Sequence, residues 1–242
     1  MRNPDFSHGF DTLLSSYATV AGFGKVDSPA TIKLDEFEKS QFLTKSQEEE
    51  VLSLYSGKNP SGESFEHTEE LRRYLAPLVK EAELQPIETS NGKPLGMESS
   101  SKFFTLPEDL WFITYERAVA AEEECDYKKN QEVYPVRQDE YHKIRKNPFR
   151  GVSDRRALRL DLSENVIEVI SKLGITSYYV RYLKKLKPIV LENFSADNLS
   201  INGVSTPTEC ELHESLHQRI LQRAVVMAIA SRGYMTSNNE NR

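Results

Sequence analysis

Apolar residues recur about every four positions near the C-terminus, which is the spacing of one face of an α-helix. The recurring positions are Leu212, Leu216, Ile220, Ala224 and Met227. They predict an amphipathic helix over residues 211–231, ended by Gly233. We expect this helix to pack on helices from the N-terminal part of the chain. The polar tail over residues 232–242 is expected to be flexible until a partner orders it.

Two more helices are predicted in the first third of the chain. Thr44 and Gln47 have the spacing of a capping box, so the first of these helices is expected to begin after Thr44. The second covers residues 65–84, and Pro77 is expected to bend or split it. Residues 1–84 are therefore expected to form an N-terminal helical region.

The pattern changes to that of strands after a linker over residues 85–101, which is rich in Ser, Gly and Pro. A short helix is expected over residues 139–146. Strands are expected over residues 103–106 and 110–119, because β-branched and aromatic residues are dense there, and residues 131–137 are expected to return as the second strand of a hairpin. Residues 157–162 and 166–171 alternate with a period of two, which is also typical of strands. A long strand is expected over residues 177–191, interrupted at Pro188, which cannot donate a ladder hydrogen bond. Short links favour antiparallel pairing, which predicts a mainly antiparallel β region over residues 102–210. The sequence thus predicts an α+β fold with N-terminal helices, a central antiparallel β-sheet and a closing C-terminal amphipathic helix.

Composition and charge narrow the class of protein. The chain has 242 residues, of which 38% are hydrophobic, and a formal net charge of −6. This is typical of a soluble globular protein and offers no overall basic field for nucleic acid. No stretch approaches the ~20 apolar residues of a membrane span, so we expect no membrane association. Cys125 and Cys210 belong to no C-x-x-C pair, which is typical of reduced thiols in a protein made in a cytoplasm.

One string could carry chemistry: residues 213–217 read H-E-x-x-H, the pattern of zinc metallopeptidases. On a helix, His213 and His217 would lie one turn apart and bind zinc, with Glu214 as general base. The extended form of the motif requires a Gly and a third His, and neither follows. We therefore expect the two histidines to lie at the edge of an amphipathic helix, and we expect the protein to have no catalytic residue, no metal and no cofactor. A zinc-dependent metallopeptidase remains the alternative function.

A second alternative is a nucleic-acid-binding module. Tyr178, Tyr179 and Tyr182 alternate with cations over residues 178–187, and aromatic rings between cations can stack on single-stranded bases. The competing interpretation packs the tyrosines inside a strand and leaves the lysines outside. The net negative charge of the chain favours interior packing.

Other residues point to contacts between proteins. The run over residues 110–113 is continuously apolar, so it is either buried on both faces or covered by a partner. Basic residues gather between residues 145 and 156. The residues that we expect at interfaces are Trp111, Phe112, Arg145, Phe149, Arg150, Arg155, Arg156, Arg232 and Tyr234.

Several strings in the same order resemble a known family of proteins. They are FEKSQFLTKSQE at 37–48, LPEDLWFI at 106–113, DEY at 139–141 with NPFR at 147–150, YLK at 182–184 with PIVL at 188–191, and LH at 212–213 with IL at 220–221 and AV at 224–225. Together they resemble the head-to-tail connector ring (adaptor-like) structural proteins of crAss-like and related tailed phages that infect Bacteroides-type bacteria. The resemblance covers about residues 10 to 231.

The resemblance implies a structural protein of the virion and not an enzyme. Such proteins form a homo-oligomeric ring, usually a dodecamer, that docks below the portal protein and contacts the next tail or ring protein. The ring extends the DNA channel toward the tail, and DNA passes through it without sequence-specific binding. The protein would be made in the host bacterial cytoplasm.

Overall fold

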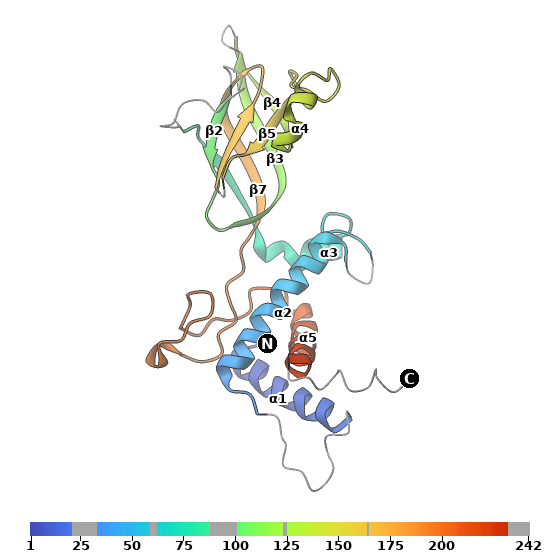
Figure 1. Cartoon of the computed structure of the whole chain (residues 1–242), viewed down its shortest axis with the longest axis vertical. Helices are drawn as coiled ribbons and strands as arrows, with labels where there is room; N and C mark the ends of the chain where they lie inside the picture. The colour runs from blue at the N-terminus through green and yellow to red at the C-terminus, as the bar shows by residue number, and fades with distance from the viewer. Residues whose placement is uncertain (21–32, 59–61, 88–100, 123–124, 164, 232–242) are drawn as a thin grey trace. The chain divides into compact units, whose positions relative to one another are not determined.

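The computed structural model describes residues 1–20, 33–58, 62–87, 101–122, 125–163 and 165–231 (Figure 1). The chain divides into two compact units. Residues Met1–Leu78 and Leu186–Arg242 form the first, which we name the helical unit. Residues Val79–Lys185 form the second, which we name the sheet unit.

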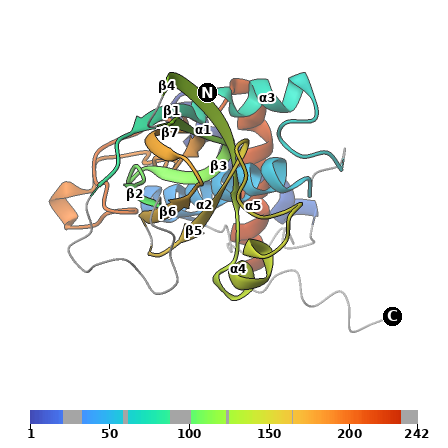
Figure 2. The same cartoon turned by 90° about the horizontal axis from the view of Figure 1, so that it is seen from above.

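The helical unit is built from segments that are far apart in the sequence. α5 packs against both α2 and α1 (Figure 1 and Figure 2). Phe6 and Phe10, one turn apart on α1, are fully buried with Ile220 and Ala224 of α5. The elements in chain order are α1 (Asn3–Val20), α2 (Glu36–Ser56), α3 (Glu69–Leu75), the 3-10 turns η1 (Ala76–Leu78), η2 (Ser195–Asp197) and η3 (Glu214–Leu216), and α5 (His217–Ser231).

The prediction that a helix begins after Thr44 is wrong, because α2 begins at Glu36, eight residues before Thr44. Asp35 is its N-cap: the side chain of Asp35 accepts a hydrogen bond from the Glu38 amide at 2.7 Å, and Glu38 completes a capping box. Thr44 lies buried in the middle of α2. Its hydroxyl accepts a hydrogen bond from the Ile189 amide at 3.0 Å. Thr44 therefore connects α2 to a distant segment of the chain.

The predicted helix over residues 65–84 is also wrong at its C-terminal end. The helix ends at Leu75, and a short 3-10 turn that contains Pro77 leads directly into a strand, β1 (Val79–Leu84). Pro77 therefore neither bends nor splits a longer helix, because no helix continues beyond it. Residues 79–84 are extended because they pair with a strand about a hundred positions later, from Val79 opposite Leu183 to Leu84 opposite Tyr178.

The sheet unit is a curled seven-stranded sheet with the strand order β1-β7-β3-β4-β5-β6-β2 (Figure 1). Every neighbouring pair is antiparallel except β4 and β5. The helix α4 (Gln138–Arg145) lies between these two strands in sequence, and this crossover returns the chain in the same direction. Besides β1, the strands are β2 (Lys102–Thr105), β3 (Leu110–Glu122), β4 (Cys125–Pro135), β5 (Arg156–Asp161), β6 (Val166–Ile170) and β7 (Gly174–Lys184).

The α+β fold with N-terminal helices, a central sheet and a C-terminal helix is thus confirmed, but the sheet is mixed. The predicted strand over residues 177–191 also needs correction. β7 ends at Lys184, and Pro188 lies beyond it in the helical unit. The amide of Leu191 donates to the Ser40 hydroxyl on α2 at 3.0 Å, so this segment is held by side chains and not by a strand ladder.

Among the described residues of the sheet unit, two clusters of apolar side chains are buried. The larger lies on the inner face of the sheet and includes Phe104, Ala118, Tyr178 and Val180. On the outer face, α4 covers β5 and β6, where Tyr141 packs on Leu158, Leu160 and Ile170. Buried residues on both faces explain why β6, with the sequence VIEVI, is almost entirely apolar.

Candidate functional site

The H-E-x-x-H string does not lie on one helix, contrary to the geometry that a zinc site requires. His213 is exposed and is the N-cap of η3, with its ring nitrogen accepting from the Ser215 amide at 3.3 Å. Glu214 belongs to this 3-10 turn, and α5 begins only at His217. The two histidines therefore do not share one helical face. The predicted amphipathic helix over residues 211–231 is shortened accordingly.

Both ring nitrogens of His217 already have partners. Nε2 lies 3.0 Å from the Leu212 carbonyl oxygen, and Nδ1 lies 2.6 Å from the amine of Met1. The carbonyl requires an N–H at Nε2, which leaves Nδ1 as the acceptor of a neutral ring. Burial lowers the pKa of His217 and favours the same neutral form. Over the described ranges, no three His, Cys, Asp or Glu side chains converge as a metal-binding group.

The tyrosines of the proposed nucleic-acid module are divided between the two faces of β7. Tyr178 is fully buried, and its hydroxyl donates to Glu116 at 2.6 Å. Tyr182 is also buried and donates to Asp109 at 2.9 Å, and burial together with this carboxylate raises its pKa to about 12. Neither ring is available for stacking on a base. Interior packing is therefore correct for these two residues, and Tyr179 lies on the other face.

The strand register places Tyr179 in a row of side chains that crosses the outer face of the sheet. Tyr179 lies opposite Arg117, Arg117 opposite Glu132, and Glu132 opposite Arg156. Directly paired residues project from the same face, so these four side chains from β7, β3, β4 and β5 form one line. The Arg117 guanidinium stacks over the Tyr179 ring at 4.7 Å.

A second row runs beside the first. Tyr115 of β3 lies opposite Arg181 of β7, and its ring meets Tyr179 at a centroid distance of 6.2 Å. On β4, Tyr134 lies under the Arg156 guanidinium at 4.5 Å and donates to Glu132 at 2.7 Å. Tyr115 is 47% exposed and Tyr134 is 41% exposed. We name this surface the arginine–tyrosine face: Tyr115, Arg117, Tyr134, Arg156, Tyr179 and Arg181.

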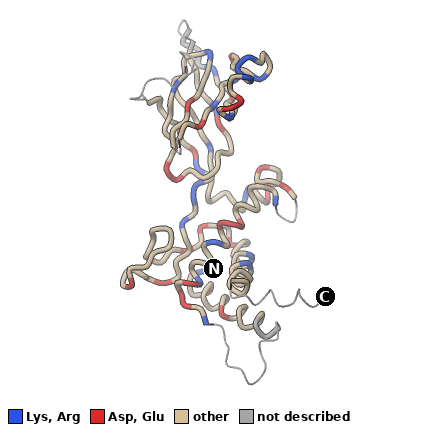
Figure 3. The backbone as a smooth tube through the Cα atoms, in the orientation of Figure 1, with Lys and Arg blue, Asp and Glu red and all other residues tan. Residues whose placement is uncertain are grey.

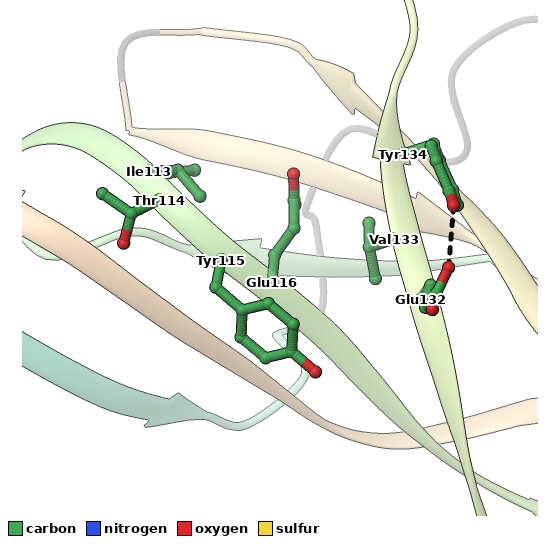
Figure 4. Close-up of a pocket in the computed structure, with 7 residues that line it drawn as sticks. All are labelled: Ile113, Thr114, Tyr115, Glu116, Glu132, Val133 and Tyr134. Atoms are coloured by element: carbon green, nitrogen blue, oxygen red, sulfur yellow. Dashed lines mark hydrogen bonds between the residues drawn. The ribbon is translucent and has the colours of Figure 1, made fainter. Parts of the chain in front are cut away.

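A cavity of about 270 Å³ opens in this face where β3 and β4 diverge (Figure 4). Among the described residues, β3 pairs with β4 only from Arg117 onward. The C-terminal end of β4 pairs with β5 instead. Tyr115 and Glu116 project from opposite faces of β3 (Figure 4). The cavity is lined by Ile113, Thr114, Tyr115, Glu116, Glu132, Val133 and Tyr134.

Glu116 belongs to a buried charge network below this cavity. The guanidinium of Arg159 donates to its carboxylate at 2.8 Å, and the two side chains are only 9% and 10% exposed. Burial raises the pKa of Glu116, and the charge of Arg159 opposes this shift in part. Arg159 also lies 3.0 Å from Asp161, which is largely exposed. The network joins β3, β5 and β7 inside the sheet.

Phe149 protrudes from the turn that follows α4, with 86% of its surface exposed. The turn holds its shape through Asn147, whose side-chain oxygen accepts from the amides of Phe149 at 2.8 Å and Arg150 at 3.2 Å. A Cβ atom at Gly151 would approach the Asn147 carbonyl oxygen to 2.8 Å, so this position requires glycine. Phe149 lines an open cavity of about 460 Å³ with Arg155, Arg156, Asn130, Glu132 and Ser153.

The other residues predicted at interfaces are dispersed. Trp111 and Phe112 are half-buried neighbours at the start of β3, with stacked rings at 4.8 Å. Arg145, Arg150 and Arg155 belong to the basic region on α4 and the turn after it (Figure 3). Arg232 and Tyr234 lie outside the described residues. The contacts assigned to these residues stay predictions.

Sequence reasoning missed Tyr115, Arg117, Tyr134 and Tyr179 as members of one surface. The period-two alternation of β3 was a usable signal, because Tyr115 and Arg117 alternate with Glu116 and the buried Ala118. The register between β3 and β7 could not be read in the same way. It joins residues about sixty positions apart, and β3 carries several irregularities.

The chain is thus an α+β protein whose sheet carries an ordered, partly exposed face of Arg and Tyr side chains. The sequence matches the family described as "Phage tail ring protein 3/4" over residues 1–240. "Ring protein 3" of Bacteroides phage crAss001 is 44% identical over 243 residues, which cover 99% of this chain and all of that protein. "Ring protein 4/5" of the same phage is 29% identical over 94% of this chain and 92% of that protein.

The chain belongs to the phage tail ring protein 3/4 family. The resemblance to ring proteins of Bacteroides phages is therefore confirmed. The family consists of structural ring proteins, which places the chain among the components of a phage virion. Among the helices that the structure describes, none has the length and hydrophobicity needed to cross a membrane.

Proposed function

We propose that this protein forms a homo-oligomeric ring of twelve copies in the head-to-tail connector of a phage. The ring docks below the portal protein on one side and on the next tail or ring protein on the other. The observation that carries this proposal is the match to a ring protein family along almost the whole chain, residues 1–240. Both units of the protein are included in that match.

Two properties of the chain support a passive channel for DNA. The net charge of −6 would repel a polyanion, so DNA passes without being retained. The buried Tyr178 and Tyr182 cannot act as stacking platforms for bases. The proposed role is mechanical: the ring lengthens the conduit, and no residue reacts with the DNA or reads its sequence. The protein is made in the host cytoplasm and incorporated there into the virion.

Native mass spectrometry of the purified chain, with trace zinc present, tests ring formation. The expected result is a closed multimer whose mass is twelve times that of the 27.7 kDa chain, with no zinc bound. A multimer with another fixed number of copies would correct the subunit count. A monomer that binds one zinc ion and loses it in His213→Ala would contradict the proposal.

Docking requires a separate experiment, because a ring could form without binding a portal. The purified protein is mixed with the portal protein of the same phage and imaged by cryo-electron microscopy. The proposal expects a ring on the tail-proximal side of the portal, coaxial with it. A ring that shows no association with portal particles at micromolar concentrations would contradict the connector role.

A further inference from the structure

The outer face of the sheet is covered over one half and open over the other. α4 packs on β5 and β6 through Tyr141. Over β4 and β3, Tyr134 and Tyr115 are more than two-fifths exposed. Phe149, at 86%, lies next to this open half, because it lines a cavity together with Glu132 and Arg156.

The open half has the composition of a protein–protein contact. Tyr and Arg are the residues most enriched at the centres of such contacts, while single exposed hydrophobic residues are common on any surface. Here the tyrosines and arginines are already ordered by one another, through the stacks of Arg117 on Tyr179 and Arg156 on Tyr134. Side chains that are held in place before binding lose little conformational entropy on contact.

The charges of this face argue against a nucleic acid as its partner. Carboxylates lie within the same rows: Glu132 between Arg117 and Arg156, and Glu83 opposite Tyr179 on β1. A surface for a phosphate backbone would have its arginines free of such carboxylates. A protein partner can offer both signs of charge in matching positions.

The distribution of charge along the chain points to a second copy as that protein. Residues 79–185, the sheet unit, carry 18 Lys and Arg against 18 Asp and Glu and are neutral. The helical unit carries 13 Lys and Arg against 19 Asp and Glu, so it accounts for the whole net charge of −6. Arg150 and Arg155, both exposed, add positive charge at the Phe149 end of the open half. The neighbouring copy therefore offers a surface of complementary sign.

We propose that the arginine–tyrosine face, together with Phe149, is the contact surface for a second copy of this chain and binds the acidic helical unit of that copy. This inference rests on the proposed function, since a ring of identical subunits needs a heterologous contact between two different surfaces. Beyond the proposed function, the inference names the surface of the sheet unit that makes the contact and the negative charge of the surface that it binds.

The test compares self-association of the full-length chain and its variants by sedimentation velocity over a range of concentrations. Tyr115→Ser and Phe149→Ser remove exposed rings, so neither disturbs the core. Each is expected to raise the concentration at half-assembly by about tenfold or more, as truncation of a central aromatic residue does. Ile87→Ser, an exposed apolar residue of the same unit, is the matched control and is expected to change it less than about twofold.

The charge contribution is tested with the double variant Arg150→Glu, Arg155→Glu. It is expected to assemble more weakly than the wild type in about 0.05 M NaCl, and the difference is expected to shrink near 0.5 M, where charges on the surface are screened. Lys102→Glu with Lys172→Glu is the control of equal charge change, on exposed residues of β2 and of the turn before β7. This control is expected to leave assembly unchanged.

Three results would overturn the inference. If Tyr115→Ser and Phe149→Ser assemble as well as the wild type, another surface makes the contact, and the proposed function is unaffected. If the wild type stays monomeric at every concentration, this face does not bind a second copy, and the portal experiment decides the proposed function separately. Binding of duplex DNA that is lost in Tyr115→Ser would assign the face to a nucleic acid instead.

Discussion

At the scale of single residues, the buried carboxylate of Glu116 is stabilised in its charged form by the ion pair with Arg159. It is buried inside the sheet unit, accepts from Tyr178 and is paired with Arg159. A buried ion pair adds little stability compared with apolar residues, but removal of one partner leaves an uncompensated charge. The pair is therefore a point where a single substitution has a large effect.

We predict that Arg159→Met lowers the free energy of unfolding of the sheet unit by about 3–5 kcal/mol near pH 8. The loss should be smaller near pH 5. Without Arg159, the raised pKa of Glu116 rises further, and its protonated form is then compatible with burial. Urea unfolding at the two pH values measures both effects.

The double variant Glu116→Gln, Arg159→Met serves as the control for this prediction. It should recover part of the lost stability, because neither charge then remains buried alone. Asp161→Asn alters the exposed partner of Arg159 and should cost less than about 1 kcal/mol. An equal loss in the single and double variants would show that Arg159 acts through packing instead.

His217 and His213 provide a second pair for comparison at this scale. Burial lowers the pKa of His217, so the unfolded chain binds a proton that the folded chain resists. The stability of the helical unit is therefore complete above the ordinary histidine pKa of about 6.5 and should decrease as the pH falls below it.

His217→Gln should cost about 1–3 kcal/mol at pH 7.5 and remove this part of the pH dependence. The exposed His213 is the matched control, and His213→Gln should change stability by less than about 0.5 kcal/mol. Thermal unfolding of both variants between pH 5 and 7.5 is the measurement. A steeper pH dependence in His213→Gln than in His217→Gln would contradict the assignment.

At the scale of elements, the start of α2 shows what sequence patterns can and cannot provide. Thr44 with Gln47 and Asp35 with Glu38 both have the spacing of a capping box, and only the second pair caps the helix. The difference lies in tertiary structure, because Thr44 is buried and its hydroxyl is used by Ile189. A local motif cannot reveal a partner 145 positions away.

We predict that Asp35→Ala destabilises the helical unit by about 1 kcal/mol, since it removes the acceptor at the N-cap. Asp35→Asn should be nearly neutral, because Asn caps almost as well. Thr44→Val should cost about 1–3 kcal/mol by leaving the Ile189 amide buried without an acceptor. Urea unfolding monitored by circular dichroism distinguishes these values, and equal losses for the two Asp35 variants would count against the cap.

The elements that the sequence predicted well were those with a strong local pattern. The expected strands over residues 157–162 and 166–171 match β5 (Arg156–Asp161) and β6 (Val166–Ile170) within a residue at each end. β1 was missed because Val79 to Leu84 includes Lys and Glu at positions that suit an exposed helix. Its extended form comes from pairing with β7, which is a long-range effect.

The candidate contact face was harder to predict than the fold. Phe149 and Arg156 were recognised from local composition, and Tyr179 was considered only for stacking on bases, whereas Tyr115 and Tyr134 read as ordinary strand residues. They form one surface only because the register aligns β7, β3, β4 and β5. A sequence pattern gives the face on which a side chain lies along one strand. It does not give its neighbours across the sheet.

At the scale of the whole molecule, the two units differ in how the chain builds them. The sheet unit is one continuous segment, Val79–Lys185, with its own buried clusters. The helical unit requires both ends of the chain, because α5 packs on α1 and α2. We predict that residues 79–185 fold alone with a cooperative thermal transition, whereas residues 1–78 alone do not.

Heteronuclear NMR spectra of the two fragments check this prediction. Well-dispersed amide signals are expected for residues 79–185 and collapsed signals for residues 1–78. Adding a peptide of residues 211–231 to the second fragment should increase its dispersion, because the peptide restores the missing side of the core. A disordered 79–185 fragment would show that the sheet unit depends on the helical unit to fold.

The pairing of β1 with β7 has a consequence for how such a subunit diversifies. Val79, the first residue of the sheet unit, lies opposite Leu183, two residues before the unit ends at Lys185, so the two ends of the unit lie close together. A segment whose two ends meet can be replaced by another of any length, or by a short turn, without stretching the chain that hosts it. Recombination between phages could therefore graft a new sheet onto an old helical scaffold, and a virus could remodel one surface of a particle component while inheriting the rest.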